Sequence, residues 1–255
     1  FNGLVVTGAA DMTVTNSVFT SVGANGSADR AIYLTTGAQG DVVITDNAFG
    51  GASTDKYSTA NWSSGIWSDG AASSLTITGN SLENVRTAMN LDSFDNASSD
   101  VSGNEISNSG TGISVGVGSD ATITTIDGNS FTGVDTDFNL RNMTSDIDFD
   151  LGGNSAADGI AVLGGSGNDT VTGSSSNDFF DGRGYGNPSG NDTFEGKGGD
   201  DVMFARDGND TAVFTSALIA GDFTTTSGVA IPGYGTFDGW VVNAGSEGSD
   251  TLIDV

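Results

Sequence analysis

The chain contains no cysteine, no histidine and only two prolines among its 255 residues. Without cysteine, neither disulfide bonds nor thiolate metal sites stabilise the fold. No run of eighteen apolar residues occurs, so the sequence predicts no membrane insertion. Stability must therefore come from another source, and bound ions are the candidate.

Basic residues are also scarce. Seven lysines and arginines oppose 33 aspartates and glutamates, which gives a formal net charge of −26. So acidic a chain lacks the cations that neutralise phosphates, and this excludes nucleic acid and anionic membranes as partners. Cations are the natural counterpart of the charge.

Glycine is abundant, and between Gly164 and Phe214 it recurs in a nine-residue phrase. The clearest copy, residues 164–172, fits the pattern G-G-x-G-x-D-x-U-x, in which U is apolar. Later copies keep an aspartate at position six and an apolar residue two positions later, with spacings of 9, 14, 9 and 9 residues. An insertion at 185–189 accounts for the longest spacing. The aspartates are Asp169, Asp178, Asp192, Asp201 and Asp210, and the apolar residues are Val171, Phe180, Phe194, Met203 and Ala212.

The phrase has the chemistry of a calcium-binding loop. Glycine permits positive φ and close backbone approach, so carbonyl oxygens can converge on one point. Aspartate adds hard anionic oxygens, which suit the six to eight oxygen ligands of Ca²⁺. The x-U-x part predicts a short strand with an inward apolar side chain, so successive phrases wind into a flattened roll with several ions along its edges. The candidate metal-binding residues are Gly165, Gly167, Asp169, Asp178, Gly190, Asp192, Gly199, Asp201, Gly208 and Asp210.

Loops one phrase apart are expected on opposite edges of this roll. One edge would carry Asp169, Asp192 and Asp210, and the other Asp178 and Asp201. Serines replace two glycines in the second copy, and Ala205-Arg206 opens the last, so we expect some sites to be weak or empty. Without metal the carboxylates repel one another and the apolar strips are thin, so the segment should be disordered until calcium binds.

In these phrases the segment resembles the hemolysin-type calcium-binding (RTX) repeats of secreted bacterial proteins. The resemblance covers about fifty residues. The tail from Asp222 to Leu252 resembles the β-hairpin cap that often closes such arrays. The resemblance implies export by a one-step (type I) route, folding outside the cell in millimolar calcium, and a secreted, extracellular location at the bacterial cell surface.

The first 160 residues form a second repeat. Short β-branched segments alternate with Gly, Asn, Ser and Asp turns, and no amphipathic helix pattern is present. Inward apolar positions recur every 23 to 25 residues, as in Ile66, Met89, Ile113 and Phe138. This is the length of one turn of a parallel β-helix. An antiparallel sandwich is disfavoured, because two-residue hairpin turns do not recur.

A series of turn asparagines should stack into an internal ladder that hydrogen-bonds the next coil's backbone. The series is Asn47, Asn80, Asn104, Asn129 and Asn154. The pattern resembles the right-handed β-helices of pectate lyases and alginate-modifying enzymes, a likeness of architecture and not of activity. The expected fold is all-β: a right-handed parallel β-helix at 1–163, running without a linker into a calcium-binding RTX β-roll at 164–214, and a C-terminal β-hairpin cap at 215–255.

Two coils carry insertions, Ser21–Arg30 and Gly50–Ser64, which are predicted to protrude at the same turn. Aromatic residues near them form a candidate interaction face: Tyr33, Tyr57, Trp62 and Trp67. Such a face suits sugar stacking or a protein interface. Alternatively, the loops fold over Tyr33 and Trp67 and bury them.

The sequence indicates no enzyme. It lacks histidine, and no nucleophile elbow, phosphate loop or zinc motif occurs. No predicted acidic triad lies beside Arg30, Arg86 or Arg141, and the carboxylates of the β-helix are too scattered to predict a catalytic pair. These carboxylates are Asp69, Glu83, Asp92 and Asp95.

We therefore interpret the chain as a secreted calcium-binding repeat module with a structural or adhesive role in a surface layer, filament or large adhesin. The alternative is a polysaccharide-binding or polysaccharide-modifying fragment, similar to alginate epimerases or lyases. Ice binding through outward threonine rows is a third interpretation, which Val43 and Asp148 weaken by interrupting the rows. The expected partners are calcium and, beyond it, a second copy of the chain or a surface polysaccharide. The sequence reads as a mature product or a fragment of something longer.

Overall fold

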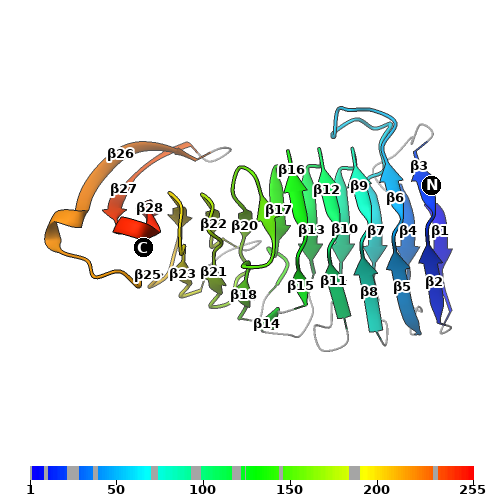
Figure 1. Ribbon diagram of the computed structural model, residues 1–255, viewed down its shortest axis with the longest axis horizontal. Coiled ribbons are helices and arrows are strands. Elements are labelled where there is room, and N and C mark those ends of the chain that lie inside the picture. Colours follow the sequence, from blue (N-terminus) through cyan, green and yellow to red (C-terminus); the bar gives the residue numbers. More distant parts are fainter. Residues whose placement is uncertain are drawn as a thin grey trace.

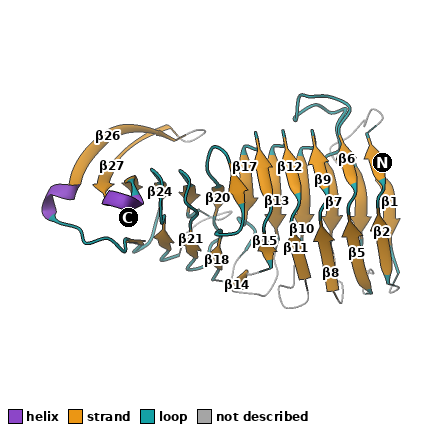
Figure 2. Cartoon of the chain, viewed as in Figure 1, coloured by secondary structure: helices purple, strands orange, loops and turns teal. Residues whose placement is uncertain are grey.

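The computed structural model describes residues 2–8, 11–21, 29–36, 40–69, 74–92, 99–116, 122–123, 125–143, 146–183, 190–231 and 235–255. These residues form a long stack of short strands, and sequence order follows the long axis of the stack until the C-terminal hairpin (Figure 1). Helical turns in the described part lie near the C-terminus, at η2 (Ala220–Asp222) and η3 (Gly245–Glu247) (Figure 2). None of its helices has the length and apolar character needed to cross a membrane.

The described strands form four sheets. The first sheet runs along the whole stack. Its strands, in spatial order, are β1 (Asn2–Val6), β4 (Arg30–Leu34), β7 (Ser64–Ser68), β10 (Thr87–Leu91), β13 (Thr111–Val115), β17 (Thr136–Asn139), β20 (Ala161–Leu163), β22 (Phe179–Asp181), β24 (Val202–Phe204), β28 (Ser249–Ile253), β27 (Gly235–Asn243) and β26 (Phe223–Ile231).

The other three sheets cover parts of the stack. The second contains β2 (Met12–Thr15), β5 (Asp41–Thr45), β8 (Ser74–Thr78), β11 (Ser99–Ser102) and β15 (Ile126–Asp127). The third contains β3 (Val18–Thr20), β6 (Ala48–Gly50), β9 (Ser81–Glu83), β12 (Glu105–Ser107), β16 (Ser130–Thr132) and β19 (Ser155–Ala156). The fourth contains β14 (Thr122–Ile123), β18 (Asp148–Asp150), β21 (Thr170–Thr172), β23 (Thr193–Glu195) and β25 (Thr211–Val213).

The cross-section of the stack changes along its length. Each early coil contributes one parallel strand to each of the first three sheets, as β7, β8 and β9 do. After β19 the coil alternates between the first and fourth sheets, which gives a flatter, two-sided roll. β20 pairs in parallel with both β17 and β22, so the β-helix passes into the roll without a break. The all-β fold and the continuous stack are as the sequence predicts.

Inward apolar side chains build one core along the stack. The predicted inward positions align in the observed register, for example Ile66, Met89 and Ile113 on three neighbouring strands. All three are fully buried. Stacked phenylalanines extend the core into the roll, where the rings of Phe180 and Phe194 lie 5.5 Å apart and nearly parallel. Burial of these side chains is the main favourable term for the β-helix.

The predicted asparagine ladder is present. Each amide nitrogen donates to the side-chain oxygen of the asparagine in the next coil, at 2.9–3.0 Å from Asn47 through Asn154. It also donates to a carbonyl of the preceding coil, as Asn80 does to Ile44 at 2.8 Å. The ladder thus satisfies buried backbone and side-chain polar groups at every turn. Its residues are scaffold.

The C-terminal hairpin adds strands to the end of the first sheet. β26 and β27 are antiparallel to each other, β27 is antiparallel to β28, and β28 is parallel to β24. The hairpin arches back toward the stack (Figure 1). A second, smaller core forms there around Phe204, Ile231 and Ile253. The predicted hairpin is therefore observed, and its last strand, β28, is also a strand of the roll.

Candidate calcium sites

The geometry of the phrase explains why its aspartates are buried. Each aspartate directly precedes a three-residue strand whose middle residue points into the core, as Asp169 precedes β21 with Val171 inside. Side chains two apart in a strand share a face, so the aspartate also points inward. The side chains of Asp169, Asp178, Asp192 and Asp201 are only 1–2% exposed.

One edge of the roll holds Asp169, Asp192 and Asp210 in a hydrogen-bonded row. The backbone N–H of Asp169 donates to Oδ1 of Asp192 at 2.9 Å, and the N–H of Asp192 donates to Oδ1 of Asp210 at 2.7 Å. The grouping is the one that the phrase spacing predicts.

The opposite edge holds Asp178 and Asp201, and a third member that the sequence analysis missed. The N–H of Asp178 donates to Oδ1 of Asp201 at 2.7 Å, and the N–H of Asp201 donates to Oδ1 of Asp250 at 2.9 Å. The signal was present, because residues 248–252 read Gly-Ser-Asp-Thr-Leu and fit the second half of the phrase. Its distance from the other copies concealed it.

Phrase position five forms a parallel row outside the aspartates. On the first edge, Asn191 N–H donates to Asn168 Oδ1 and Asn209 N–H donates to Asn191 Oδ1, both at 2.8 Å, so each loop forms one rung of the row. On the second edge, Asp200 N–H donates to Asn177 Oδ1 and Ser249 N–H to Asp200 Oδ1, both at 2.9 Å. Each loop is therefore bonded to its neighbours in both directions along the stack.

Glycines are required where stacked loops meet. A Cβ added at Gly190 would lie less than 3.0 Å from the carbonyl oxygen of Gly167, and one at Gly208 equally close to that of Gly190. Gly199, with φ of 113°, faces the carbonyl of Ser176 in the same way. These glycines therefore let the backbones of stacked loops approach closely, and a Cβ at Gly208 would also lie less than 3.0 Å from Oδ1 of Asp210.

Three aspartates of the roll have a buried carboxylate oxygen that accepts no hydrogen bond from any described residue: Oδ2 of Asp192, of Asp201 and of Asp210. An unpaired buried polar atom costs about 1–3 kcal/mol, and more if it is charged. A hard cation would satisfy these atoms, and carboxylate and carbonyl oxygens are the donors that Ca²⁺ prefers. The donor set therefore fits calcium.

The first two phrases differ from the later ones. Gly165 N–H donates to Oδ2 of Asp169 at 2.7 Å, and Ser174 N–H donates to Oδ2 of Asp178 at 2.7 Å. The Ser174 hydroxyl adds a hydrogen bond to Oδ1 of Asp178 at 3.1 Å. The other oxygen of each carboxylate accepts an N–H from the preceding coil, Ile147 for Asp169 and Ile160 for Asp178. Both carboxylates therefore gain less from a cation than Asp192 does.

In the later phrases the second position has a left-handed backbone. Lys197 has φ of 70° and Arg206 has φ of 82°, a region that favours glycine. Arg206 is held there by a bidentate ion pair with Asp181, with Nε–Oδ1 at 2.8 Å and Nη2–Oδ2 at 2.9 Å. Its guanidinium also lies 3.5 Å from the ring centre of Phe204. These side-chain contacts thus stabilise the left-handed backbone at Arg206, where the last phrase has arginine in place of glycine.

Burial raises the pKa of Asp169, Asp192 and Asp201 to about 7, although backbone N–H groups that donate to them oppose the rise. Burial likewise raises the pKa of Asp250 to about 6. The metal-free carboxylates are therefore partly protonated near neutral pH, and a bound cation would have to displace those protons.

No group of three or more acidic side chains converges on one point within the described part of the chain. A site in the roll must therefore combine one or two carboxylates from neighbouring rungs with main-chain carbonyls of the glycine loops. Calcium accepts such mixed oxygen sets.

One member of the predicted aromatic face, Trp62, is buried. Trp62 is 4% exposed and belongs to the core, so its inclusion in an exposed face is wrong. Its loop lies along later coils, where Lys56 pairs with Asp135, the Tyr57 hydroxyl donates to Asp135, and Asn108 donates to Thr54 O at 2.7 Å. Tyr57 remains 55% exposed. The buried tryptophan anchors the long loop.

Tyr33 and Trp67 lie half-buried on neighbouring strands of the first sheet. The Arg30 guanidinium lies 4.2 Å from the ring centre of Tyr33 and 3.9 Å from that of Trp67, and Asp69 accepts hydrogen bonds from both rings. Asp92 directly follows β10, as Asp69 directly follows the neighbouring strand β7, so the two are neighbours and not scattered. Residues 22–28 of the first insertion, and Asp95, lie outside the described residues.

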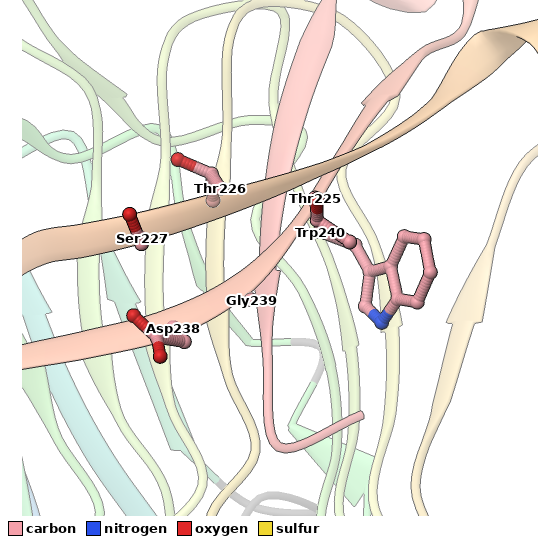
Figure 3. A pocket seen from close by; sticks show the side chains of 6 residues that line it. All are labelled: Thr225, Thr226, Ser227, Asp238, Gly239 and Trp240. Atoms are coloured by element: carbon pink, nitrogen blue, oxygen red, sulfur yellow. The ribbon is translucent and has the colours of Figure 1, made fainter.

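A hollow of about 490 Å³ lies on the C-terminal hairpin. Figure 3 shows its lining, which combines the Trp240 indole with hydroxyl and carboxylate groups. Trp240 is 49% exposed. The lining residues are Thr225, Thr226, Ser227, Asp238, Gly239 and Trp240.

Fold and site together define a parallel β-helix that continues into a calcium-binding repeat roll. A family model of the RTX calcium-binding nonapeptide repeat, in four copies, matches residues 162–184 and 189–213. No curated protein and no solved structure is significantly similar to the chain. Residues 162–184 and 189–213 thus belong to RTX calcium-binding repeats, and the strands before them form a parallel β-helix.

Proposed function

We propose that the chain is a secreted structural or adhesive module of a bacterial cell surface, folded and made rigid by extracellular calcium. The observation that carries the proposal is the row of buried carboxylate oxygens without a hydrogen-bond donor among the described residues. RTX repeats are typical of secreted proteins, and the acidic, cysteine-free composition suits a calcium-rich location where ions replace disulfides.

On the first edge, the carboxylates of Asp192 and Asp210 and the carbonyls of Gly167 and Gly190 would hold the metal. On the second edge, Asp201 takes the equivalent position. When bound, calcium supplies positive charge that neutralises the buried carboxylates. The glycine loops hold their carbonyls near the carboxylates, and the inward apolar residues fix the strands between them. Because the unfolded chain has no such site, binding free energy becomes folding free energy.

A calcium titration followed by circular dichroism tests the proposal. The expected result is a gain of β signal with calcium that chelation reverses, while magnesium at equal concentration has a weaker effect. Full β signal in the presence of excess chelator, without change on adding calcium, would contradict calcium-coupled folding. If light scattering shows larger assemblies of the chain in calcium than in chelator, the result would support the structural role over a monomeric sugar-binding module.

A polysaccharide-binding role is the second candidate. It is favoured by a cluster on the first sheet that consists of Arg30, Tyr33, Trp67, Asp69 and Asp92, here called the Arg30 cluster. Its two aromatic rings, guanidinium and paired carboxylates offer stacking and hydrogen bonds to a sugar chain. Alginate and pectate oligosaccharides should then bind to the chain, and Trp67→Ala should abolish binding while Trp240→Ala in the hairpin hollow leaves it intact. Formation of unsaturated products or altered epimer ratios would extend the role to polysaccharide modification.

A further inference from the structure

The last strand of the chain repeats the calcium phrase beyond the part matched by the RTX family model, which ends at residue 213. We infer that Asp201 and Asp250 form a calcium site between the roll and the C-terminal hairpin, so that the same ion which completes the roll also fastens the hairpin to it. This inference rests on the proposed calcium-coupled folding.

The hydrogen bonds at this junction match those inside the roll. Asp201 N–H donates to Asp250 Oδ1 at 2.9 Å, as Asp192 N–H donates to Asp210 Oδ1 at 2.7 Å. Thr251 N–H donates to the carbonyl of Asp201 at 2.7 Å, as Thr211 N–H does to that of Asp192 at 2.8 Å. The Asp250 loop therefore stands where the next phrase of the array would stand.

The glycine of this loop has the same relation to its neighbour as those of the matched phrases. Gly248 has φ of 100°, and a Cβ there would lie less than 3.0 Å from the carbonyl oxygen of Gly199. Gly208 meets Gly190 in this way on the other edge. The Gly199 carbonyl and the Asp200 carboxylate, which accepts the Ser249 N–H at 2.9 Å, thus both lie against the loop that carries Asp250.

The junction also contains an unsatisfied ligand atom. Asp201 is 1% exposed, its Oδ1 accepts the N–H of Asp178, and its Oδ2 accepts no hydrogen bond from any described residue. Asp250 is also 1% exposed. Two buried carboxylates in adjacent rungs, one with a free oxygen, form an unfavourable pair without a cation and a favourable pair with one.

The site joins segments that are distant in the sequence. The step from Asp201 to Asp250 spans 49 residues, whereas the other rungs of the roll are 18 or 23 residues apart. The intervening chain contains β25, β26 and β27, and it is also fixed by Glu247, whose carboxylate accepts the N–H groups of Thr215 and Ser216. An ion at this position offsets the closure entropy of the longest loop in the roll. Because β27 pairs with β28, the hairpin depends on this docking.

Hydrogen exchange on the full chain, with calcium and with chelator, tests the inference without any mutation. We expect the amides of β26, β27 and β28 to gain protection with calcium. Protection of this hairpin that is equal in calcium and in chelator, while β21, β23 and β25 respond, overturns the inference and leaves the proposed function intact. If no calcium binds to the chain at all, it is the proposed function that fails.

Asp250→Asn adds a count of bound ions by equilibrium dialysis. We expect this variant to bind one ion fewer than the wild type and to lose hairpin protection by about tenfold or more in calcium, with β21 and β23 still protected. Asp238→Asn, an exposed hairpin carboxylate, is the matched control and should bind the wild-type number of ions. An unchanged ion count in Asp250→Asn overturns the inference.

Discussion

Replacing Asp192 with asparagine should change the stability of the roll in opposite directions without and with calcium. The Asp192 side chain is 1% exposed, and burial raises its pKa from 3.8 to about 7. The raised folded-state pKa means that ionisation opposes folding of the metal-free chain. This cost in folding free energy is absent below the pKa of Asp192 in the unfolded chain, which is near 4. It grows as the pH rises to 7 and then levels off at about 4 kcal/mol.

Asparagine keeps an oxygen that can accept the Asp169 N–H but carries no charge. Its amide nitrogen needs a partner of its own, so only part of the electrostatic cost is recovered. We expect Asp192→Asn to stabilise the calcium-free roll by about 1–3 kcal/mol at slightly alkaline pH. In millimolar calcium the same variant should be less stable than the wild type, because one ligand is lost.

The assay is hydrogen exchange of the β21, β23 and β25 amides in calcium and, for the calcium-free roll, in chelator with a stabilising osmolyte that populates the folded state. Asp178→Asn is the control, because Ser174 and Ile160 already donate to both oxygens of Asp178. Without calcium Asp178→Asn should not stabilise the roll, because its amide nitrogen would face one of these N–H donors. Calcium-induced folding should be weakened more by Asp192→Ala than by Asp178→Ala. A destabilised Asp192→Asn variant in chelator, or a larger calcium defect at Asp178, would refute the reasoning.

Four further predictions concern other parts of the stack. Calcium binding should release protons below about pH 7 and weaken as the pH falls, because the buried carboxylates then hold protons; calorimetry in buffers of different ionisation enthalpy measures the release. Asn104→Ala should cost about 2–4 kcal/mol in thermal melts of the β-helix, because ladder groups of both neighbouring coils lose partners. Gly190→Ala should reduce calcium-induced folding in a circular dichroism titration, whereas Gly50→Ala, which meets no atom within 4 Å, should not. Arg206→Ala should destabilise the roll by about 2–3 kcal/mol in chemical denaturation, because buried Asp181 loses its bidentate partner and keeps only the longer ion pair with Arg141; wild-type midpoints would contradict this.

The repeat phrases and the coil period predict most of the fold, because each repeated residue contacts the equivalent residue of the adjacent coil. An inward apolar position every 23 to 25 residues fixes the β-helix, and a stacking asparagine fixes its turn. The glycine–aspartate phrase likewise fixes both rows of the roll, since its period alternates the edges.

Contacts between distant segments could not be predicted in this way. Asp250 joins its row only because a hairpin returns the chain to the roll 49 residues after Asp201. Trp62 is buried because its loop runs toward later coils, a direction that loop composition does not encode. Asp69 and Asp92 are 23 residues apart in the sequence but directly follow two neighbouring strands, β7 and β10.

The most direct test of the account is limited proteolysis of the full chain with and without a chelator, with the cleavage sites mapped by mass spectrometry. If calcium neutralises the buried carboxylate rows, chelation should open residues 164–255 to cleavage while the coils from β4 to β16 stay resistant. Equal resistance of both parts in chelator would contradict the account.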